Sequence, residues 1–371
     1  MKVAIVGPAY PLRGGIAHHV YCLEKELTGR GHTVDVISYK RLYPRLFFPG
    51  TTEKDDSTSK LDPHALPILT PLNPITWARA LKAIKAFSPD VVVFQWWQPF
   101  FAPMIGMLGR ALRRNGIRCI FECHNVMPHE SSPFDRLLLR FASKAADSFI
   151  THSEADRNIL LALVSGKRIG VAPLPTPEIF RGGTNTTRAG RTILFFGKVR
   201  PYKGLDVLLA AMPEVLSKLD CRLTIIGEFY DSVDNCRNLI RQLGLDEHVS
   251  LEDRYVNNEE IVEIFDRVDV LVLPYREASQ SAVAHIALSN ALPIISSSAG
   301  GLSENIVENV TGLIFPAGDS TALADQIVSY FSNSLGPVFA GNLLSARINK
   351  NSELGQLVED LAQSKHKATS F

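Results

Sequence analysis

Long apolar runs and paired cysteines are both missing from this chain of 371 residues. No stretch of about 18 uncharged apolar residues occurs, so we expect no transmembrane helix. Of the five cysteines only Cys119 and Cys123 lie close together, and no second pair completes a metal site or a disulfide framework. The chain leads directly into an apolar strand pattern at Val3, without the features of a signal peptide. These absences favour a reduced cytoplasmic protein with free thiols.

Two further patterns are absent. Neither half of the chain carries G-x-G-x-x-G after its first predicted strand, which argues against a nicotinamide-dependent dehydrogenase. No repeat of about 20–50 residues is visible, so the chain is not a solenoid.

Charge is nearly balanced overall but unevenly distributed. The net charge is +1, yet residues 1–175 carry 22 Lys and Arg against 14 Asp and Glu, whereas the remainder carries 17 against 24. One basic and one acidic half indicate two domains with different neighbours. A basic half can face anionic lipid or an anionic acceptor, although dispersed surface charges also simply keep a protein soluble.

Short apolar runs alternate with helical patterns along the whole chain, which predicts parallel sheets covered by helices. The predicted strands are Val3–Val6, Val34–Ser38, Val91–Gln95, Cys119–Cys123 and Ser148–His152 in the first half, and Thr192–Phe196, Arg222–Ile226, Val249–Glu252, Val270–Leu273, Pro293–Ser297 and Leu313–Phe315 in the second. Two doubly wound α/β domains in tandem would place the carboxyl ends of both sets of strands at one interdomain cleft, where such sheets bind ligands.

The boundary between the domains is predicted from composition. Pro, Gly, Thr and Asn are concentrated in residues 173–190. We therefore expect an N-terminal domain over residues 1–178 and a C-terminal domain over residues 188–345. Residues 50–63 are polar and lack periodicity, which predicts a mobile loop within the first domain.

The most informative segment joins a buried strand to a helix through a short basic loop. The apolar run Thr192–Phe196 stops at Gly197, and a helical pattern resumes at Leu205. A glycine at the carboxyl end of a parallel strand lets a ligand approach the backbone. Arg200 and Lys203 stand beside the free amides of a helix N-terminus, which already favours anions. The segment predicts a diphosphate-binding loop, although a solvated basic turn would have the same composition.

Five segments, in order, resemble the motifs of one enzyme family. They are GGIAHHV from Gly14, RGHTVDVIS from Arg30, HNVMPHE from His124, GKVRPYKG from Gly197, and LPYREASQS from Leu273 followed by PII at Pro293 and GGLSEN at Gly300. Together they resemble the group-1 glycosyltransferases, family 4, over nearly the whole chain, with HNVMPHE typical of one branch. The resemblance implies a retaining enzyme of the GT-B type, in which two Rossmann-like, doubly wound domains face a central cleft. It also implies that the helical pattern within residues 350–371 packs back on the N-terminal domain.

The resemblance assigns roles on both sides of that cleft. Arg200 and Lys203 would stabilise the charge that develops on the leaving diphosphate, which favours the transition state over the ground state. His124 would contact the transferred sugar or support charge near the anomeric carbon. The expected donor-binding residues are Gly197, Gly204, Glu228, Gln280 and Ser281, and the expected acceptor-side residues are Gly14, Gly15, His129 and Glu130.

Structural explanations remain open for several of these residues. Gln280 and Ser281 either offer backbone amides to the diphosphate or only cap the helix that follows them. His124 could instead be satisfied inside a turn, and His129 and Glu130 could merely fix their loop. The two glycines at 14 and 15 could form a plain tight turn.

One departure from the family concerns two glutamates separated by seven residues. Counting back from Pro293 places the pair at Ala278 and Ile286, so both glutamates are missing. Glu277 and His285 have the same gap one position earlier, but one position rotates a helical side chain by about 100°. In the family the second glutamate holds the donor ribose, and the present branch carries A-S-Q-S in place of the motif. The change favours an altered donor geometry over inactivity.

The segment from Trp96 to Arg118 is apolar with a basic end. This pattern fits a helix that rests on anionic lipid near a lipid-linked acceptor. Core packing of an ordinary helix with a cationic last turn explains it about as well.

These observations predict a retaining hexosyltransferase that moves a sugar from a nucleotide-diphosphate donor to a glycan or lipid-linked acceptor, in surface polysaccharide biosynthesis. We expect no metal or cofactor besides the sugar nucleotide, because cations occupy the phosphate site, and no nucleic-acid partner. The expected location is the cytoplasm, with peripheral contact to the inner face of the membrane as an open alternative. The rival functions are a nucleotide-sugar epimerase, with Glu130 or Glu228 as acid/base groups, and a non-catalytic nucleotide- or glycan-binding partner.

Overall fold

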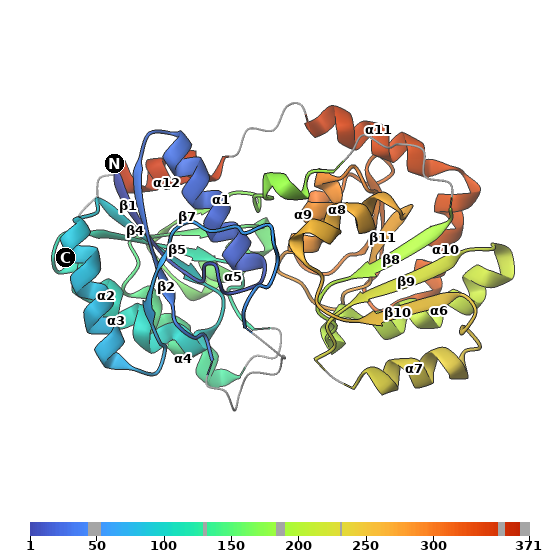
Figure 1. Cartoon of the computed structure of the whole chain (residues 1–371), viewed down its shortest axis with the longest axis horizontal. Helices are drawn as coiled ribbons and strands as arrows, with labels where there is room; N and C mark the ends of the chain where they lie inside the picture. The colour runs from blue at the N-terminus through green and yellow to red at the C-terminus, as the bar shows by residue number, and fades with distance from the viewer. Residues whose placement is uncertain (44–52, 129–131, 183–189, 231, 348–352, 364–371) are drawn as a thin grey trace.

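Parallel strands form two separate sheets in the computed structural model, which describes residues 1–43, 53–128, 132–182, 190–230, 232–347 and 353–363. Apolar clusters lie on both faces of each sheet, under the helices that cover them. The chain therefore forms two α/β domains that lie side by side (Figure 1).

The first sheet has seven parallel strands in the order β3-β2-β1-β4-β5-β6-β7. Its elements are β1 (Lys2–Val6), α1 (Gly15–Gly29), β2 (Thr33–Tyr39), β3 (Leu66–Leu69), α2 (Pro74–Phe87), β4 (Val91–Trp96), η2 (Pro99–Phe101), α3 (Ala102–Arg113), β5 (Arg118–Cys123), α4 (Pro133–Ser143), β6 (Ser148–Thr151), α5 (Glu154–Leu163), β7 (Arg168–Val171) and η3 (Glu178–Phe180). The strand order reverses at β1, which pairs with both β2 and β4. Such a switch point leaves a crevice at the carboxyl ends of the strands.

The second sheet has six parallel strands in the order β10-β9-β8-β11-β12-β13. Its elements are β8 (Thr192–Phe196), η4 (Pro201–Lys203), α6 (Leu205–Lys218), β9 (Arg222–Gly227), α7 (Val233–Gln242), β10 (Val249–Asp253), α8 (Asn258–Asp266), β11 (Val270–Leu273), α9 (Ala282–Ser289), β12 (Ile294–Ser297), η5 (Ser303–Asn305), β13 (Gly312–Phe315), α10 (Ser320–Ser332) and α11 (Leu335–Arg347). The two sheets confirm the predicted fold class of two Rossmann-like, doubly wound domains. Every predicted strand is present, and the edge strands β3 and β7 are additional.

The last described helix, α12 (Leu354–Gln363), lies on the first domain, against α1 and β5 (Figure 1). Leu354 and Val358 are fully buried in the apolar cluster on that face of the first sheet. At its rim the Glu359 carboxylate accepts a hydrogen bond from Arg30 Nε at 2.7 Å. The end of the described chain thus belongs to the N-terminal core.

The polar segment after residue 52 packs between the domains and is not a free loop. Asp55 and Ser57 are buried. The amide of Asn258, at the start of α8, donates to Ser57 Oγ at 3.0 Å, and its side-chain nitrogen donates to Asp55 Oδ2 at 3.2 Å. Polarity therefore reflects interdomain hydrogen bonding in this segment, and the prediction of a mobile loop is wrong for residues 53–63.

The apolar segment that begins at Trp96 lies in the core. Trp96, Phe101 and Met104 have no solvent exposure, and Arg110 and Arg113 follow in the last turn of α3. Most of the apolar side chains of this segment thus pack inward, as the alternative of core packing predicts, whereas Met107 is 56% exposed. No described helix is both long and apolar enough to cross a membrane.

Candidate active site

Two glycines shape the basic loop between β8 and α6. Gly197 ends the strand with φ of +101°, and Gly204 begins the helix with φ of +66°. A Cβ atom on Gly204 would lie 2.0 Å from the carbonyl oxygen of Pro274. The positive φ and the close approach both require glycine, and they bend the chain so that Lys203 turns back towards the strand end.

Lys203 lies where three elements meet. Its side chain is 8% exposed, and its ammonium lies 5.1 Å from the ring centre of Tyr275. A Cβ atom built on Gly197 would lie 3.5 Å from Lys203 Nζ and 3.3 Å from Val283 Cγ2, in the first turn of α9. The end of β8, the ammonium and the first turn of α9 thus come close together.

Further cations stand beside Lys203. The Arg200 guanidinium lies 4.5 Å from the ring centre of Tyr230, and Lys198 Nζ lies 5.3 Å from the same ring. Desolvation and then repulsion from Arg13, of the other domain, lower the pKa of Lys198 to about 8. A cluster of repelling cations beside a helix N-terminus favours a bound anion.

Glu228, a predicted donor-binding residue, pairs with the opposite domain. Both of its carboxylate oxygens lie 2.7 Å from Nη2 of Arg13, and the two side chains are 10% and 3% exposed. Arg13 also lies 4.5 Å from the ring centre of Tyr255. Glu228 therefore takes part in a buried ion pair across the domains.

The side chains of Gln280 and Ser281 bond within their own domain. Ser281 Oγ accepts from the amide of Ala284, which makes Ser281 the N-cap of α9. Gln280 Nε2 donates to the carbonyl of Gly301 at 2.9 Å, and its Oε1 accepts from Asn305 at 2.7 Å. The groups that this segment can offer to an anion are therefore its backbone amides.

Gly14 and Gly15 form the turn into α1 and face the donor half of the molecule. Gly14 has φ of +117° and is the N-cap of the helix. A Cβ atom on Gly15 would lie 3.4 Å from the Cβ of Ala282, the first residue of α9. The glycine loop thus approaches the same helix N-terminus that adjoins Lys203. His129 and Glu130 lie outside the described residues.

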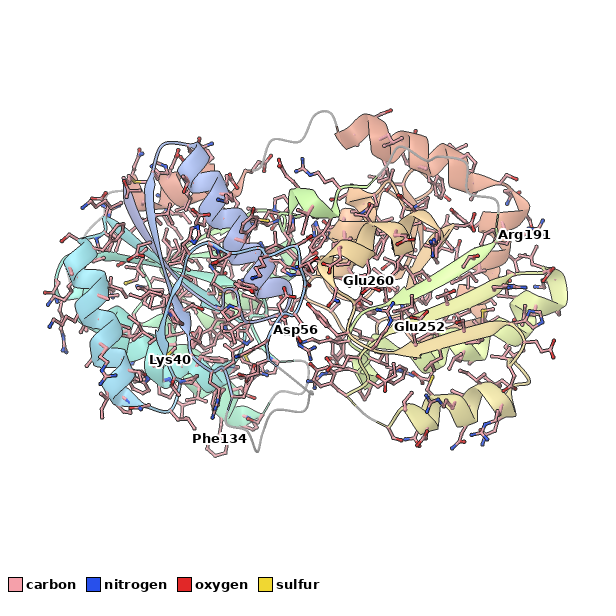
Figure 2. The ribbon with its side chains drawn as sticks, in the orientation of Figure 1. Lys40, Asp56, Phe134, Arg191, Glu252 and Glu260 are labelled. Atoms are coloured by element: carbon pink, nitrogen blue, oxygen red, sulfur yellow. The ribbon has the colours of Figure 1, made fainter. Side chains whose placement is uncertain are left out.

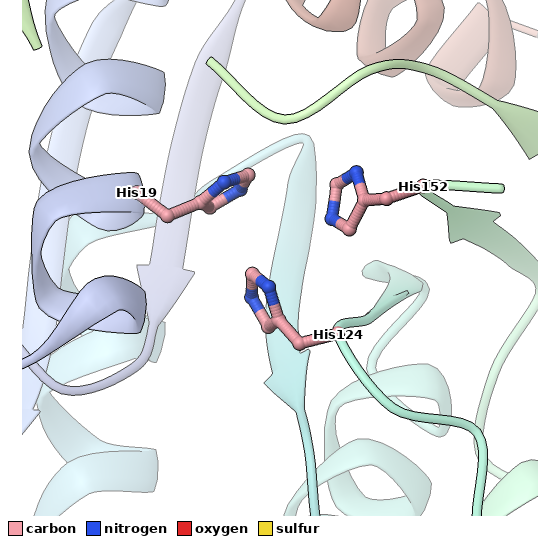
Figure 3. A group of neighbouring side chains, drawn as sticks. All are labelled: His19, His124 and His152. Atoms are coloured by element: carbon pink, nitrogen blue, oxygen red, sulfur yellow. The ribbon is translucent and has the colours of Figure 1, made fainter. Parts of the chain in front are cut away.

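His124 belongs to a group of three imidazoles at the carboxyl ends of the first sheet (Figure 3). The ring centre of His19, from α1, lies 4.6 Å from that of His124 and 5.1 Å from that of His152, which follows β6. The fully buried Glu122, on β5, has its Oε1 2.7 Å from His19 Nε2 and 3.6 Å from His152 Nε2. The Glu122 carboxylate thus accepts a hydrogen bond from His19 and also lies close to His152.

A hydrogen-bond chain fixes the proton of His124. Gln95 Nε2 donates to Glu122 Oε2 at 2.6 Å, so the amide oxygen of Gln95 must face the other way. That oxygen lies 2.6 Å from His124 Nε2 and can only accept. His124 therefore carries its proton on Nε2, and its Nδ1 keeps a lone pair when the ring is neutral.

Burial and mutual repulsion set the charges of this group. Burial, then His19 and His152, lower the pKa of His124 well below its usual value. Burial would raise the pKa of Glu122, but the imidazoles, above all His19, lower it to about 2. The carboxylate therefore stays ionised while His124 stays neutral.

The three histidines also form a potential metal-ligand group. One ring nitrogen of each lies within 4.8 Å of the others. Glu122 and Gln95 engage Nε2 of His19 and of His124, so we interpret the group as a hydrogen-bonded cluster in which Nδ1 of His19 keeps no hydrogen-bond partner among the described residues.

The buried histidines predict that the protein loses stability in mild acid. Burial, then repulsion from His19, lowers the pKa of His152 from 6.5 to about 4. The unfolded chain takes up this proton below pH 6.5 and the folded chain does not, so stability falls as pH drops from 6.5 towards 4. The loss for His152 is about 3 kcal/mol. Urea unfolding at several pH values between 6.5 and 4 measures this loss of stability. His152→Gln should reduce the slope, whereas His64→Gln, at a side chain that is 93% exposed, should not; equal slopes would contradict the prediction.

A pocket of about 820 Å³ lies beside the basic loop, between α6 and α7. Its wall is largely apolar, with Leu205, Leu209 and Leu239, and Arg200 lies at its border. Lys203, Gly197 and the start of α9 do not line it. The pocket therefore shares Arg200 with the predicted diphosphate site and does not include Lys203 or Gly197.

Several site residues escape prediction from the sequence. Arg13, Gln95 and Glu122 carry no motif of their own, and their contacts cross 215, 29 and 103 positions of the chain. His19 lies inside a recognised motif, but nothing in that motif indicates its carboxylate partner.

Two facing Rossmann-like domains, with cations at the strand ends of one and histidines at those of the other, define a glycosyltransferase of the GT-B type. The model of Glycosyltransferase Family 4 matches residues 13–176, and that of Glycosyl transferases group 1 matches residues 190–333. An uncharacterised glycosyltransferase of Methanocaldococcus jannaschii is 31% identical over 360 residues, which cover 89% of each chain. The chain belongs to the group-1 glycosyltransferases, family 4.

Solved structures share the fold at low sequence identity. Sucrose-phosphate synthase of Thermosynechococcus elongatus has a TM-score of 0.77 and 18% identity, with 97% of this chain and 98% of that chain covered. Anabaena HepE in complex with UDP-glucose has a TM-score of 0.73 and 15% identity, with 98% and 100% covered. At these identities the likeness shows the fold alone.

Proposed function

We propose that this chain is a retaining hexosyltransferase that takes its sugar from a nucleoside-diphosphate donor and transfers it to a glycan or a lipid-linked acceptor of surface polysaccharide synthesis. The observation that carries the proposal is the close approach of Gly197, Lys203 and the first turn of α9 to one another. An ammonium, backbone amides and a helix N-terminus together suit a diphosphate. Anabaena HepE, with the same fold, binds UDP-glucose.

In this proposal the C-terminal domain holds the leaving group. Arg200 and Lys203 stabilise the charge that the diphosphate gains as the glycosidic bond breaks, and the amides at the start of α9 donate to it from the opposite side. Gly14 and Gly15 let the N-terminal domain approach the same phosphates without side chains in the way. The side chains of Arg200 and Lys203 balance the charge of the diphosphate as a metal ion would, so we expect no loss of activity in EDTA.

The N-terminal domain presents the sugar and the acceptor. His124 contacts the transferred sugar, and Gln95 and Glu122 set the tautomer with which it does so. Retention at the anomeric carbon rests on the family, and proton NMR of the first-formed product tests it. In the family the second glutamate contacts the donor ribose. Ile286 occupies that position here and packs in an apolar cluster, so its side chain does not replace the contact.

A thermal-shift panel of UDP, GDP, ADP and their sugars tests the donor site. A ligand at about 100 times its dissociation constant adds roughly 2.7 kcal/mol of stability. We expect one nucleotide base to raise the melting temperature, and Arg200→Ala to abolish the shift. The same shift in EDTA supports a metal-free site.

Other results would favour the rival functions. No shift with any nucleotide, or binding without sugar transfer to any acceptor, would indicate a non-catalytic partner. Conversion of the donor into its epimer without an acceptor would indicate an epimerase.

A further inference from the structure

An exposed apolar face on the N-terminal domain lies outside the site described above. Met107 of α3 and Phe134, Leu137 and Phe141 of α4 are 56%, 74%, 65% and 39% exposed. The α4 residues follow helical spacing and form one stripe, and Phe134 points outward at the edge of the molecule (Figure 2). We call these four residues the α4 face. Single exposed apolar residues are common, but a contiguous group marks an interaction site.

The α4 face is held rigidly by α3. The ring of Phe141 lies directly over Gly106, where an added Cβ atom would be 2.7 Å from it. The Arg110 guanidinium lies 4.0 Å from the centre of the same ring, and it donates to the carbonyl of Phe141. At its other end α4 is fixed by the capping box of Ser132 and Asp135. The exposed stripe is therefore part of a packed helix pair.

Cations border the α4 face. Exposed or half-exposed basic side chains come from both helices: Arg110, Arg113 and Arg114 from α3, and Arg136, Arg140 and Lys144 from α4 and its C-cap. The nearby acids are engaged, since Asp135 caps α4 and Asp147 pairs with Arg113 at 2.8 Å. An apolar stripe with a basic border is the pattern of a helix that lies in a membrane interface.

We propose that the α4 face docks the protein on an anionic lipid bilayer, with Phe134 and Leu137 inserted between the headgroups and the basic border on the lipid phosphates. The inference rests on the proposed function in one respect, namely the lipid-linked acceptor. Helix α4 begins nine residues after His124, so the α4 face and the proposed sugar site are close in the sequence and belong to one domain. A second copy of the chain fits this face poorly, because a two-fold contact would bring the same cations together.

Flotation with phosphatidylcholine vesicles, with and without phosphatidylglycerol, tests the proposal. We expect binding only to the anionic vesicles and weakening of that binding by salt. Phe134→Ser with Leu137→Ser should reduce binding at least tenfold. Arg136→Gln with Arg140→Gln should reduce it about 25-fold, because each cation near an anionic surface contributes about fivefold.

Leu72→Ser with Ile75→Ser is the matched control, since both residues are exposed apolar side chains of the same domain outside the α4 face, at 63% and 65%. Its binding should equal that of the wild type. Absence of binding, or equal losses in the two serine variants, would overturn the proposal. Self-association that Phe134→Ser with Leu137→Ser abolishes would also overturn it and assign the face to a second copy. All variants should keep the nucleotide-induced thermal shift, so a failure of membrane docking is distinct from a failure of the donor site.

Discussion

Replacing Arg200 or Lys203 by alanine should lower kcat/KM by about one to two orders of magnitude and leave the fold intact. A hydrogen bond to a charged group contributes about 1.5–3 kcal/mol, and each 1.36 kcal/mol is tenfold in rate. The charge on the diphosphate grows as the glycosidic bond breaks, so these contacts strengthen in the transition state. Lys203, which is only 8% exposed, should show the larger effect.

Release of the nucleoside diphosphate, from the donor that the thermal-shift panel identifies, measures this loss. Arg276→Ala is the matched control, because Arg276 is bound to the same loop but pairs with Asp206 at 2.6 Å on the surface. Exposed pairs of this kind contribute little, so Arg276→Ala should retain activity within about threefold. Near-normal kinetics in both Arg200→Ala and Lys203→Ala would remove them from the reaction.

The sequence predicts the fold well because each buried parallel strand corresponds to a short run of apolar residues. β4 and β11, for example, consist entirely of buried residues. The edge strands β3 and β7 lack this signal. Pro67 lies within β3, and in β7 a Cβ atom on Gly170 would lie 2.5 Å from Leu357 of α12. The residues next to Gly170 in the sequence do not indicate that it belongs to a strand. A glycine is needed there because α12, from the far end of the chain, packs against it.

The candidate site likewise has a part that the sequence predicts and a part that it does not. The basic loop is recognisable because Gly197, Lys203 and Gly204 lie close together in the sequence, and their spacing alone indicates a strand, a turn and a helix. The contact of Arg13 with Glu228 joins residues 215 positions apart. The sequence therefore predicts a charged residue at 228 but not that its partner comes from the other domain.

Sequence patterns also fail to distinguish a buried helix from a surface one. The apolar residues from Trp96 onward resemble a lipid-binding segment, yet most of them, Trp96, Phe101 and Met104 among them, are buried in the first domain. In α4 the same kind of pattern leaves Phe134 and Leu137 exposed. Which side of an amphipathic helix meets the core depends on where its sheet lies, and that is a property of the tertiary structure.

Replacing Glu122 by glutamine should lower activity about ten- to hundredfold, as expected for a residue that orients a catalytic group. The change keeps the shape but replaces one of the two acceptor oxygens by a donor, so either Gln95 Nε2 or His19 Nε2 loses its acceptor. When the new donor faces Gln95 Nε2, the Gln95 amide turns over. Its nitrogen would then face His124 Nε2, and the proton of His124 would have to move to Nδ1. Nitrogen-15 NMR of the imidazole should report this change of tautomer, which a purely structural role would not produce.

Exchanging the side chains at positions 95 and 122 tests whether Glu122 acts through the tautomer of His124. Gln95→Glu combined with Glu122→Gln keeps one carboxylate and one amide in the pair and again places an acceptor 2.6 Å from His124 Nε2. We expect the double variant to recover the Nε2 tautomer and most of the lost kcat, with KM little changed. Glu122→Gln alone should recover neither. If Glu122→Gln is as active as the wild type, or if the double variant is no better than either single one, Glu122 acts only in folding. Because the cluster holds His124 neutral through repulsion as well as through hydrogen bonds, recovery of the tautomer without recovery of activity would separate these two effects.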